Sequence, residues 1–171
     1  MILDAGLVFS SAQAITTTAD STSVIDITGV GAGTAPAMIG DLGTNTAIGT
    51  DLGASGHATP WVVFTVSTAP TSTTNTLTIT LSGAPDNGSY SAGTYTALTS
   101  TPAITGANLP VGTVISFPVP PISPGAALNR FYKLTYTASA TLTAMVASAY
   151  LTIEPPTSAV AKKYPTNYVA A

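Results

Sequence analysis

Charged side chains are scarce in this chain. Lysine and arginine occur 4 times and aspartate and glutamate 7 times in 171 residues, so charged residues make up 6% of the sequence. A soluble domain usually carries about a quarter of its residues as charged side chains. Because the mean hydropathy is also positive, at +0.42, much of the surface must consist of hydroxyl, methyl and peptide groups. Such a surface is poorly protected against association, and we expect the protein to work while packed against other protein.

Basic residues are too few for a nucleic-acid partner. Binding to a phosphate backbone uses clustered lysine and arginine. This chain has Arg130, Lys133, Lys162 and Lys163 alone, and its net charge is −3. The sequence therefore predicts that no nucleic acid is bound.

Cysteine and long apolar runs are also missing. Without cysteine, neither disulfides nor thiolate metal sites contribute to the fold. No eighteen apolar residues run together, so we expect no membrane-spanning helix and no membrane partner. The opening MILDAGLVFSSAQA is apolar, but it lacks a basic start and Asp4 interrupts it. This pattern does not predict a secretory signal.

Residues suited to catalysis are nearly absent. A Ser-His-Asp triad would need His57, the single histidine, with a serine and Asp41, Asp51 or Asp86, and no Gly-x-Ser-x-Gly motif occurs. Glycoside hydrolysis uses two carboxyl groups at a defined separation, and Glu154 is the one glutamate. We therefore expect a protein that is not an enzyme.

Metal and phosphate motifs are equally weak. Asp41 and Asp51 offer oxygen ligands for calcium, but the acidic cluster with a bidentate glutamate is lacking. We expect both aspartates to cap turns by accepting hydrogen bonds from backbone N–H groups. No Gly-Lys-Thr and no Gly-x-Gly-x-x-Gly motif that opens a helix is present. The sequence therefore predicts no metal and no cofactor.

The apolar residues that are present alternate with polar ones, which is the period of a β-strand. The alternation is clearest in 76–81, where three aliphatic residues fall on one face and three threonines on the other. In 61–66, the apolar Trp61 and Val63 indicate that the second face is also partly covered. The residues of these two segments expected to point into a core are Val62, Phe64, Val66, Leu77, Ile79 and Leu81. Five further strands are expected at 24–27, 95–98, 114–117, 131–136 and 142–153.

Turn residues separate these segments. The Asn87-Gly88 pair suits a turn that needs positive φ. Four prolines in 118–125 remove four backbone donors, so this stretch is expected to be a long connection that leaves a sheet edge. No segment repeats its apolar residues at helical spacing, and threonine and valine disfavour helix.

The sequence thus predicts an all-β protein, an antiparallel β-sandwich of either jelly-roll or immunoglobulin-like topology. The absence of the immunoglobulin cysteine pair favours a jelly roll. We expect the sandwich at 23–154, an extended N-terminal arm at 1–22, a long Gly-rich loop at 29–58 and a C-terminal tail at 155–171. The apolar residues expected to anchor a partner from these arms are Ile2, Leu3, Leu7, Met38, Ile39, Leu42, Ile48, Leu52, Tyr164 and Tyr168.

Aromatic side chains support one alternative function. Trp61, Tyr90, Tyr95, Tyr132 and Tyr136 include enough rings to line a sugar-stacking platform on a sandwich. Tyr132 and Tyr136 share one strand face, which is also the pattern of a core face. A carbohydrate-binding or adhesin-type module is therefore the alternative hypothesis.

Four segments resemble a known family. Residues 7–16 (LVFSSAQAIT) and 21–27 (STSVIDI) are similar to the opening of the capsid cement proteins of short-tailed bacteriophages related to the tropism-switching Bordetella phage. VVFTV at 62–66 and RFYKLTY at 130–136 look like that family's early strand and its Arg-aromatic-x-x-Leu-x-Tyr strand.

This resemblance implies a jelly-roll decoration protein on the outer surface of a virion, made in the cytoplasm of a bacterial host. It implies that the protein bridges major capsid protein subunits and stabilises the shell against internal DNA pressure. We expect self-association as well, as a homodimer or else a trimer. The chain departs from the family in its tail after Pro155 and in a longer insert, where Asp-Leu-Gly occurs at both 41–43 and 51–53.

Overall fold

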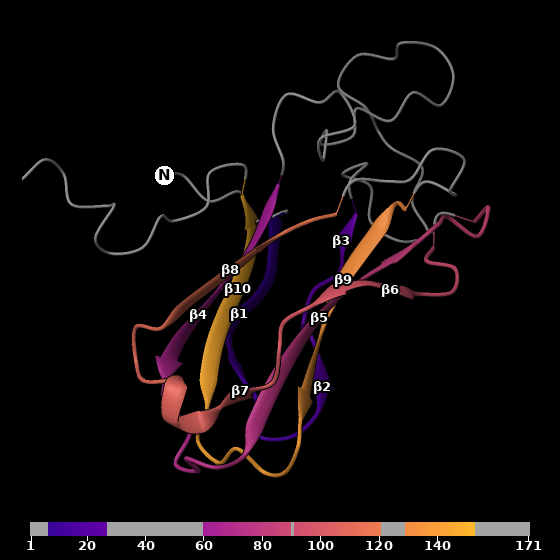
Figure 1. Cartoon of the computed structure of the whole chain (residues 1–171). Coiled ribbons are helices and arrows are strands. Elements are labelled where there is room, and N and C mark those ends of the chain that lie inside the picture. Colours follow the sequence, from indigo (N-terminus) through magenta and orange to yellow (C-terminus); the bar gives the residue numbers. More distant parts are fainter. Residues whose placement is uncertain (1–6, 27–59, 90, 121–128, 153–171) are drawn as a thin grey trace, which may run out of the picture.

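The computed structural model describes residues 7–26, 60–89, 91–120 and 129–152 (Figure 1). The described elements are β1 (Val8–Ala14), β2 (Ala19–Asp20), β3 (Ile25–Asp26), β4 (Trp61–Thr68), β5 (Thr76–Ala84), β6 (Thr96–Ser100), β7 (Ile104–Thr105), the 3-10 turn η2 (Gly106–Asn108), β8 (Val114–Pro118), β9 (Phe131–Ala138) and β10 (Val146–Thr152). No α-helix occurs in these ranges, which confirms the all-β prediction.

The strands form two antiparallel sheets that lie as two layers (Figure 1). The four-stranded sheet, here called sheet A, has the order β1-β10-β4-β8. The six-stranded sheet, here called sheet B, has the order β2-β9-β5-β6, and in addition β3 pairs with β9 and β7 with β5. Side chains from both sheets make up one buried apolar cluster, so the predicted sandwich is confirmed.

The strands pair in a nested order along the chain. The first strand, β1, pairs with the last, β10, and β2 and β3 pair with β9. Next inward, β4 pairs with β8, and β5 pairs with β6 and β7. Contacts between residues far apart in the sequence therefore hold both sheets together.

The core follows the predicted alternation. Leu77, Ile79 and Leu81 of β5 are fully buried, as are Val62 and Phe64 of β4. On the other face of β4, Val63 is also fully buried and Trp61 is half-buried. The prediction that this second face of 61–66 is partly covered is therefore confirmed.

The strand expected over 142–153 begins later than predicted. Thr143 and Ala144 have φ values of 34° and 63°, and two successive left-handed residues do not fit the extended backbone of a regular strand. They turn the backbone so that Leu142 and Met145 are both buried before β10 begins at Val146. An apolar pattern that looked continuous is therefore a turn followed by a strand.

The N-terminal arm was predicted over too long a range. β1 spans Val8–Ala14 and belongs to sheet A, and Phe9 and Ile15 are fully buried in the core. Leu7, expected to anchor a partner, is half-buried and packs against the core of its own chain. Residues 7–22 are therefore part of the sandwich, and residues 1–6 lie outside the described ranges.

Candidate functional site: one uncharged sheet and two ionic clusters

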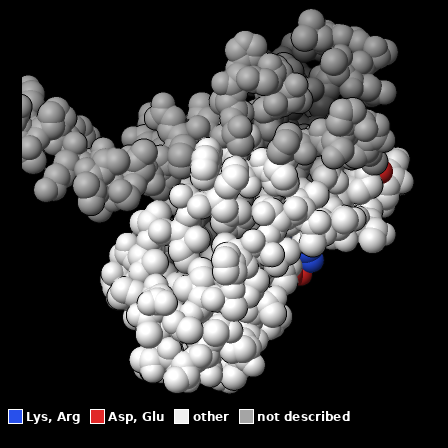
Figure 2. All heavy atoms as spheres, viewed as in Figure 1, with Lys and Arg blue, Asp and Glu red and all other residues white. Residues whose placement is uncertain are grey.

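The two sheets differ sharply in charge. The five charged residues within the described ranges are Asp20, Asp26, Asp86, Arg130 and Lys133, and all lie on sheet B or on the connections that flank its strands. The four strands of sheet A contain no charged residue. In Figure 2 the described surface is almost wholly uncharged, and the few ionic atoms in view lie on the side of sheet B.

Arg130 forms the larger ionic cluster. Its Nε donates to Asp26 Oδ1 at 3.0 Å and its Nη2 to Asp26 Oδ2 at 2.9 Å, while its Nη1 donates to Asp86 Oδ2. The guanidinium also lies 4.8 Å from the centre of the Phe131 ring. The hydrogen bond to Asp26 is the main reason why the pKa of Arg130 is raised. Because Arg130 and Asp26 are each only 11% exposed, this is a well-shielded two-pronged ion pair.

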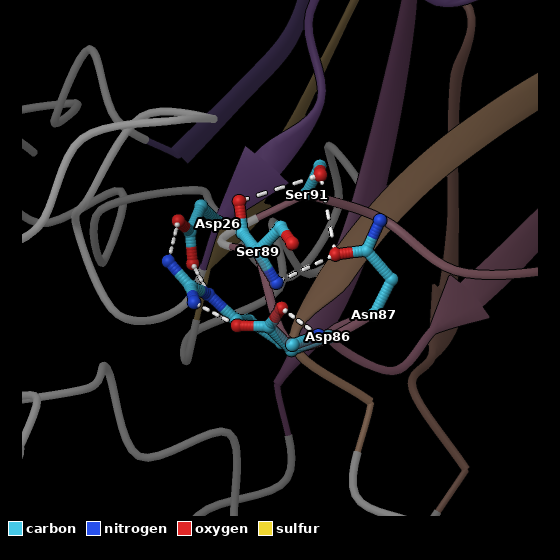
Figure 3. Close-up of polar contacts among 7 residues, drawn as sticks. Asp26, Asp86, Asn87, Ser89 and Ser91 are labelled. Atoms are coloured by element: carbon cyan, nitrogen blue, oxygen red, sulfur yellow. Dashed lines mark hydrogen bonds and ion pairs between the residues drawn. The ribbon is translucent and has the colours of Figure 1, made fainter.

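A tight turn holds Asp86 in place for this pair (Figure 3). The Gly88 N–H donates to Asp86 Oδ1 at 2.9 Å, and the Ser89 N–H donates to Asn87 Oδ1 at 2.8 Å. Gly88 has a φ of 87°, so the predicted positive-φ turn at Asn87-Gly88 is confirmed. The cluster thus joins the end of β3, the start of β9 and the turn after β5.

Lys133 forms the smaller cluster, on the outer face of sheet B. Its Nζ lies 2.7 Å from Asp20 Oδ2, and the Thr135 hydroxyl donates to Asp20 Oδ1 at 2.6 Å. The ammonium also lies 4.6 Å from the centre of the Tyr95 ring. The bond from Lys133 is the main cause that lowers the pKa of Asp20, while burial and then the Asp20 charge raise the pKa of Tyr95. The described charges are thus all engaged in pairs.

The outer face of sheet A carries aliphatic, aromatic and hydroxyl groups. Val8, Tyr150, Val63 and Ser116 are successive neighbours across the four strands. In the next row, Trp61 of β4 lies between Thr152 of β10 and Pro118 of β8. Val63 is already fully buried within the chain, whereas Trp61, Tyr150 and Ser116 stay at least partly exposed. With no ionic group on the strands to desolvate, this exposed part of the face is suited to burial against another uncharged protein surface.

Most of the predicted anchor residues cannot be placed. The nine that lie outside the described ranges are Ile2, Leu3, Met38, Ile39, Leu42, Ile48, Leu52, Tyr164 and Tyr168. His57, Asp41, Asp51 and Glu154 also lie outside these ranges. The sequence analysis did not predict the uncharged outer face of sheet A. The absence of charged residues from the sequences of all four strands could have indicated it.

Two of the five rings named for the carbohydrate hypothesis lie in the core. Tyr132 is 2% exposed and Tyr136 is fully buried, and both belong to the core. Of the other three rings, Tyr90 lies outside the described ranges, Trp61 is on sheet A, and Tyr95 immediately precedes β6 of sheet B. The face shared by Tyr132 and Tyr136 is therefore a core face.

The described ranges hold neither a metal-binding cluster nor a membrane-spanning helix. In this part of the chain no three His, Cys, Asp or Glu side chains come close enough together to hold a metal ion. Nor does this part contain a helix with the length and apolar character needed to cross a bilayer. Comparison of the sequence with protein-family models and with curated proteins gives no significant match.

Proposed function

We propose that this protein is a capsid decoration protein that binds the outer surface of a bacteriophage head. In this role it bridges neighbouring major capsid subunits and stabilises the shell. The observation that carries the proposal is the charge asymmetry of the sandwich: the strands of sheet A contain no charged residue, whereas the described charges are paired on sheet B.

The asymmetry favours one orientation on the shell. Burying an uncharged face costs little desolvation, whereas burying the exposed Lys133–Asp20 pair of sheet B would remove water from two charges, at a cost of several kcal/mol per ion. Sheet A would therefore face protein and sheet B would face water.

We infer further that the sandwich is a jelly roll. A jelly roll arises when an antiparallel ribbon of eight strands folds over itself, so that the first strand pairs with the eighth, the second with the seventh, the third with the sixth and the fourth with the fifth. Counting β2 with β3 and β6 with β7 as single positions gives this nested order here. The order also agrees with the fold implied by the resemblance to phage cement proteins.

Two threonines provide a matched test of the binding face. Thr65 on β4 and Thr78 on β5 are both half-buried, both point outward, and both lie on inner strands of their sheets. We expect Thr65→Lys to weaken co-sedimentation with phage heads that lack the protein by at least about tenfold. Thr78→Lys should bind like the unaltered chain.

The same heads provide the functional readout. Heads decorated with the unaltered protein or with Thr78→Lys should withstand heating better than bare heads, and Thr65→Lys should restore this resistance only at higher concentration. Failure of the unaltered protein to bind heads would refute the proposed function. Equal loss of binding in both variants would refute the orientation alone.

A further inference from the structure

Sheet edges expose unpaired backbone groups, and three of the four edges in this sandwich are protected. β1 has two register shifts against β10, and its Ala12 has a φ of 47°. β2 and β3 have two residues each and carry Asp20 and Asp26. At the opposite edge of sheet B, β7 has two residues and the pairing of β6 is shifted between Leu81 and Ser82. Bulges, charges and short strands are recognised means of preventing edge-to-edge pairing.

The fourth edge, β8, has almost none of this protection. It spans Val114–Pro118, contains no charged residue, and pairs with β4 over five residues without a register shift. Pro118, its last residue, is the one feature that limits further pairing, because proline has no N–H to donate. An uncharged and regular edge is normally an aggregation hazard. We therefore expect another strand to pair with β8 when the protein works.

The hydrogen bonds to β4 show which backbone groups of β8 face outward. Val66 donates to the Thr113 carbonyl at 3.0 Å, and Val119 donates to the Pro60 carbonyl at 2.9 Å. Since backbone groups alternate in direction along a strand, odd-numbered residues of β8 face β4. The N–H and C=O groups of Val114 and Ser116 therefore point away from the sheet, and none of the described residues lies beyond them in the strand order.

Apolar side chains accompany this open edge. Val111 is 66% exposed and Val114 is 48% exposed, and they are two of the three large aliphatic residues within the described ranges that are this exposed. Ile115 and Phe117 point inward and are only half-buried, although they pack against the core. A strand added at β8 would pack against Val114, Ile115 and Phe117 and complete the wall of the core.

We propose that the occupant is β8 of a second copy of this chain, paired antiparallel about a two-fold axis at Ser116. In this register Ser116 lies opposite Ser116 of the second copy, and the two residues exchange two hydrogen bonds. The N–H of Val114 donates to the Pro118 carbonyl of the second copy, twice by symmetry, whereas the Val114 carbonyl receives no hydrogen bond from Pro118, which has no N–H. Ile115 then lies beside Phe117 of the second copy on the core side.

A second copy fits this edge because the interface is self-complementary. Around a two-fold axis a residue close to the axis lies near its own symmetry mate, so a charge there would face a like charge of the second copy, and β8 has none. Pairing would join two copies of sheet A into one continuous eight-stranded sheet. The inference does not rest on the shell-binding function, because self-association is measured on the purified chain alone.

The first test is the mass of the full chain in solution, by sedimentation over roughly a hundredfold range of concentration. We expect a dimer that Ser116→Pro and Val114→Lys convert to monomer, with the dissociation constant raised by at least about tenfold. Proline at 116 removes an N–H that faces away from β4, so the internal ladder keeps its hydrogen bonds. Circular dichroism and thermal unfolding verify that both variants are folded, and Thr137→Lys, exposed on β9, is the matched control.

Cross-linking tests the register. The chain has no cysteine, so Ser116→Cys introduces a single thiol at the two-fold axis, where mild oxidation should give a disulfide-linked dimer that a reductant reverses. Thr137→Cys should stay monomeric under the same conditions. A monomeric unaltered chain, or dimers of unchanged mass in both Ser116→Pro and Val114→Lys, would overturn the proposal. If the unaltered chain is monomeric, loss of shell binding in Ser116→Pro, which adds no charge to the outer face of sheet A, would instead assign the edge to a strand of the shell protein.

Discussion

The Ser10 hydroxyl on β1 and the Tyr136 hydroxyl on β9 lie 2.7 Å apart and form a hydrogen bond between the two sheets. Ser10 Oγ also donates to Gln13 Oε1 at 2.6 Å. Because a serine hydroxyl carries one proton, Tyr136 must be the donor to Ser10. The Thr22 N–H donates to the same Gln13 oxygen at 3.0 Å. A chain of hydrogen bonds therefore leads from the core to the connection between β2 and β3.

Ser10→Ala should destabilise the fold more than Tyr136→Phe. Without Ser10, the Tyr136 hydroxyl is a buried donor with no partner, which costs about 1–3 kcal/mol. Without the Tyr136 hydroxyl, Ser10 still donates to Gln13, so the loss should be nearer about 0.5–1.5 kcal/mol. Urea unfolding of the two variants and of the double variant measures both values. Equal losses, or the reverse order, would contradict the assigned direction of the bond.

Tyr136 should also make the fold sensitive to alkali. Burial raises the pKa of Tyr136 to about 12, whereas a tyrosine in an unfolded chain has a pKa near 10. The folded state therefore keeps a proton that the unfolded state loses, and the stabilisation is present below about pH 10 and is lost as the pH rises toward 12. Urea midpoints between about pH 8 and 11 measure this loss. Tyr136→Phe should show a shallower decline, and an unchanged slope would argue against the assignment.

Asp20 should contribute in the opposite pH range. Hydrogen bonds from Lys133 and Thr135 lower its pKa from 3.8. This contribution is present above about pH 4 and is lost as the pH falls through the lowered value. Because the Asp20 side chain is 50% exposed, the effect at neutral pH should stay below about 1 kcal/mol. In Asp20→Asn the free energy of unfolding should therefore fall less steeply below about pH 4 than in the parent. Urea unfolding at several acid pH values measures this, and an unchanged slope would show that Asp20 does not contribute to stability in this way.

Arg130→Ala should be more damaging than loss of the Lys133 pair. It leaves the Asp26 carboxylate, which is 11% exposed, without its two-pronged partner, at a cost of about 2–4 kcal/mol. Arg130→Lys should recover only part of this loss, because an ammonium cannot span both oxygens of Asp26 and reach Asp86. Thermal unfolding of Arg130→Ala, Arg130→Lys and Lys133→Ala gives the ranking. Full rescue by lysine would mean that charge alone matters at this position.

If sheet A faces the shell, attachment should depend only weakly on salt. Ions screen interactions between charges, and the strands of sheet A have none. Binding to heads should therefore change by less than about threefold when NaCl is raised from about 0.1 M to 1 M. Co-sedimentation at several salt concentrations checks this. Release of the protein at moderate salt would indicate an ionic interface formed by other residues.

The sequence was most informative where a strand is regular. β5 alternates without interruption over 76–81, and β4 departs from alternation at Val63, where its second face is covered, so the buried faces of both strands were predicted correctly. β1 was mistaken for part of an arm because its register shifts break the alternation, and Phe9 and Ile15 are separated by a polar stretch. The Arg130–Asp26 pair joins residues 104 positions apart, a distance over which local periodicity carries no information.

The pairing of β1 with β10 has a consequence for how the protein is made. A growing chain emerges from the ribosome with β1 first, and its partner is the last described strand, 132 residues later from Ala14 to Val146. Sheet A cannot close during most of synthesis, and contacts this distant make folding slow. Until β10 has been synthesised, the uncharged strand β1 has no partner in its own chain. It can then pair with other nascent chains, so the yield of folded protein should fall when these chains are crowded and rise when chaperones are abundant.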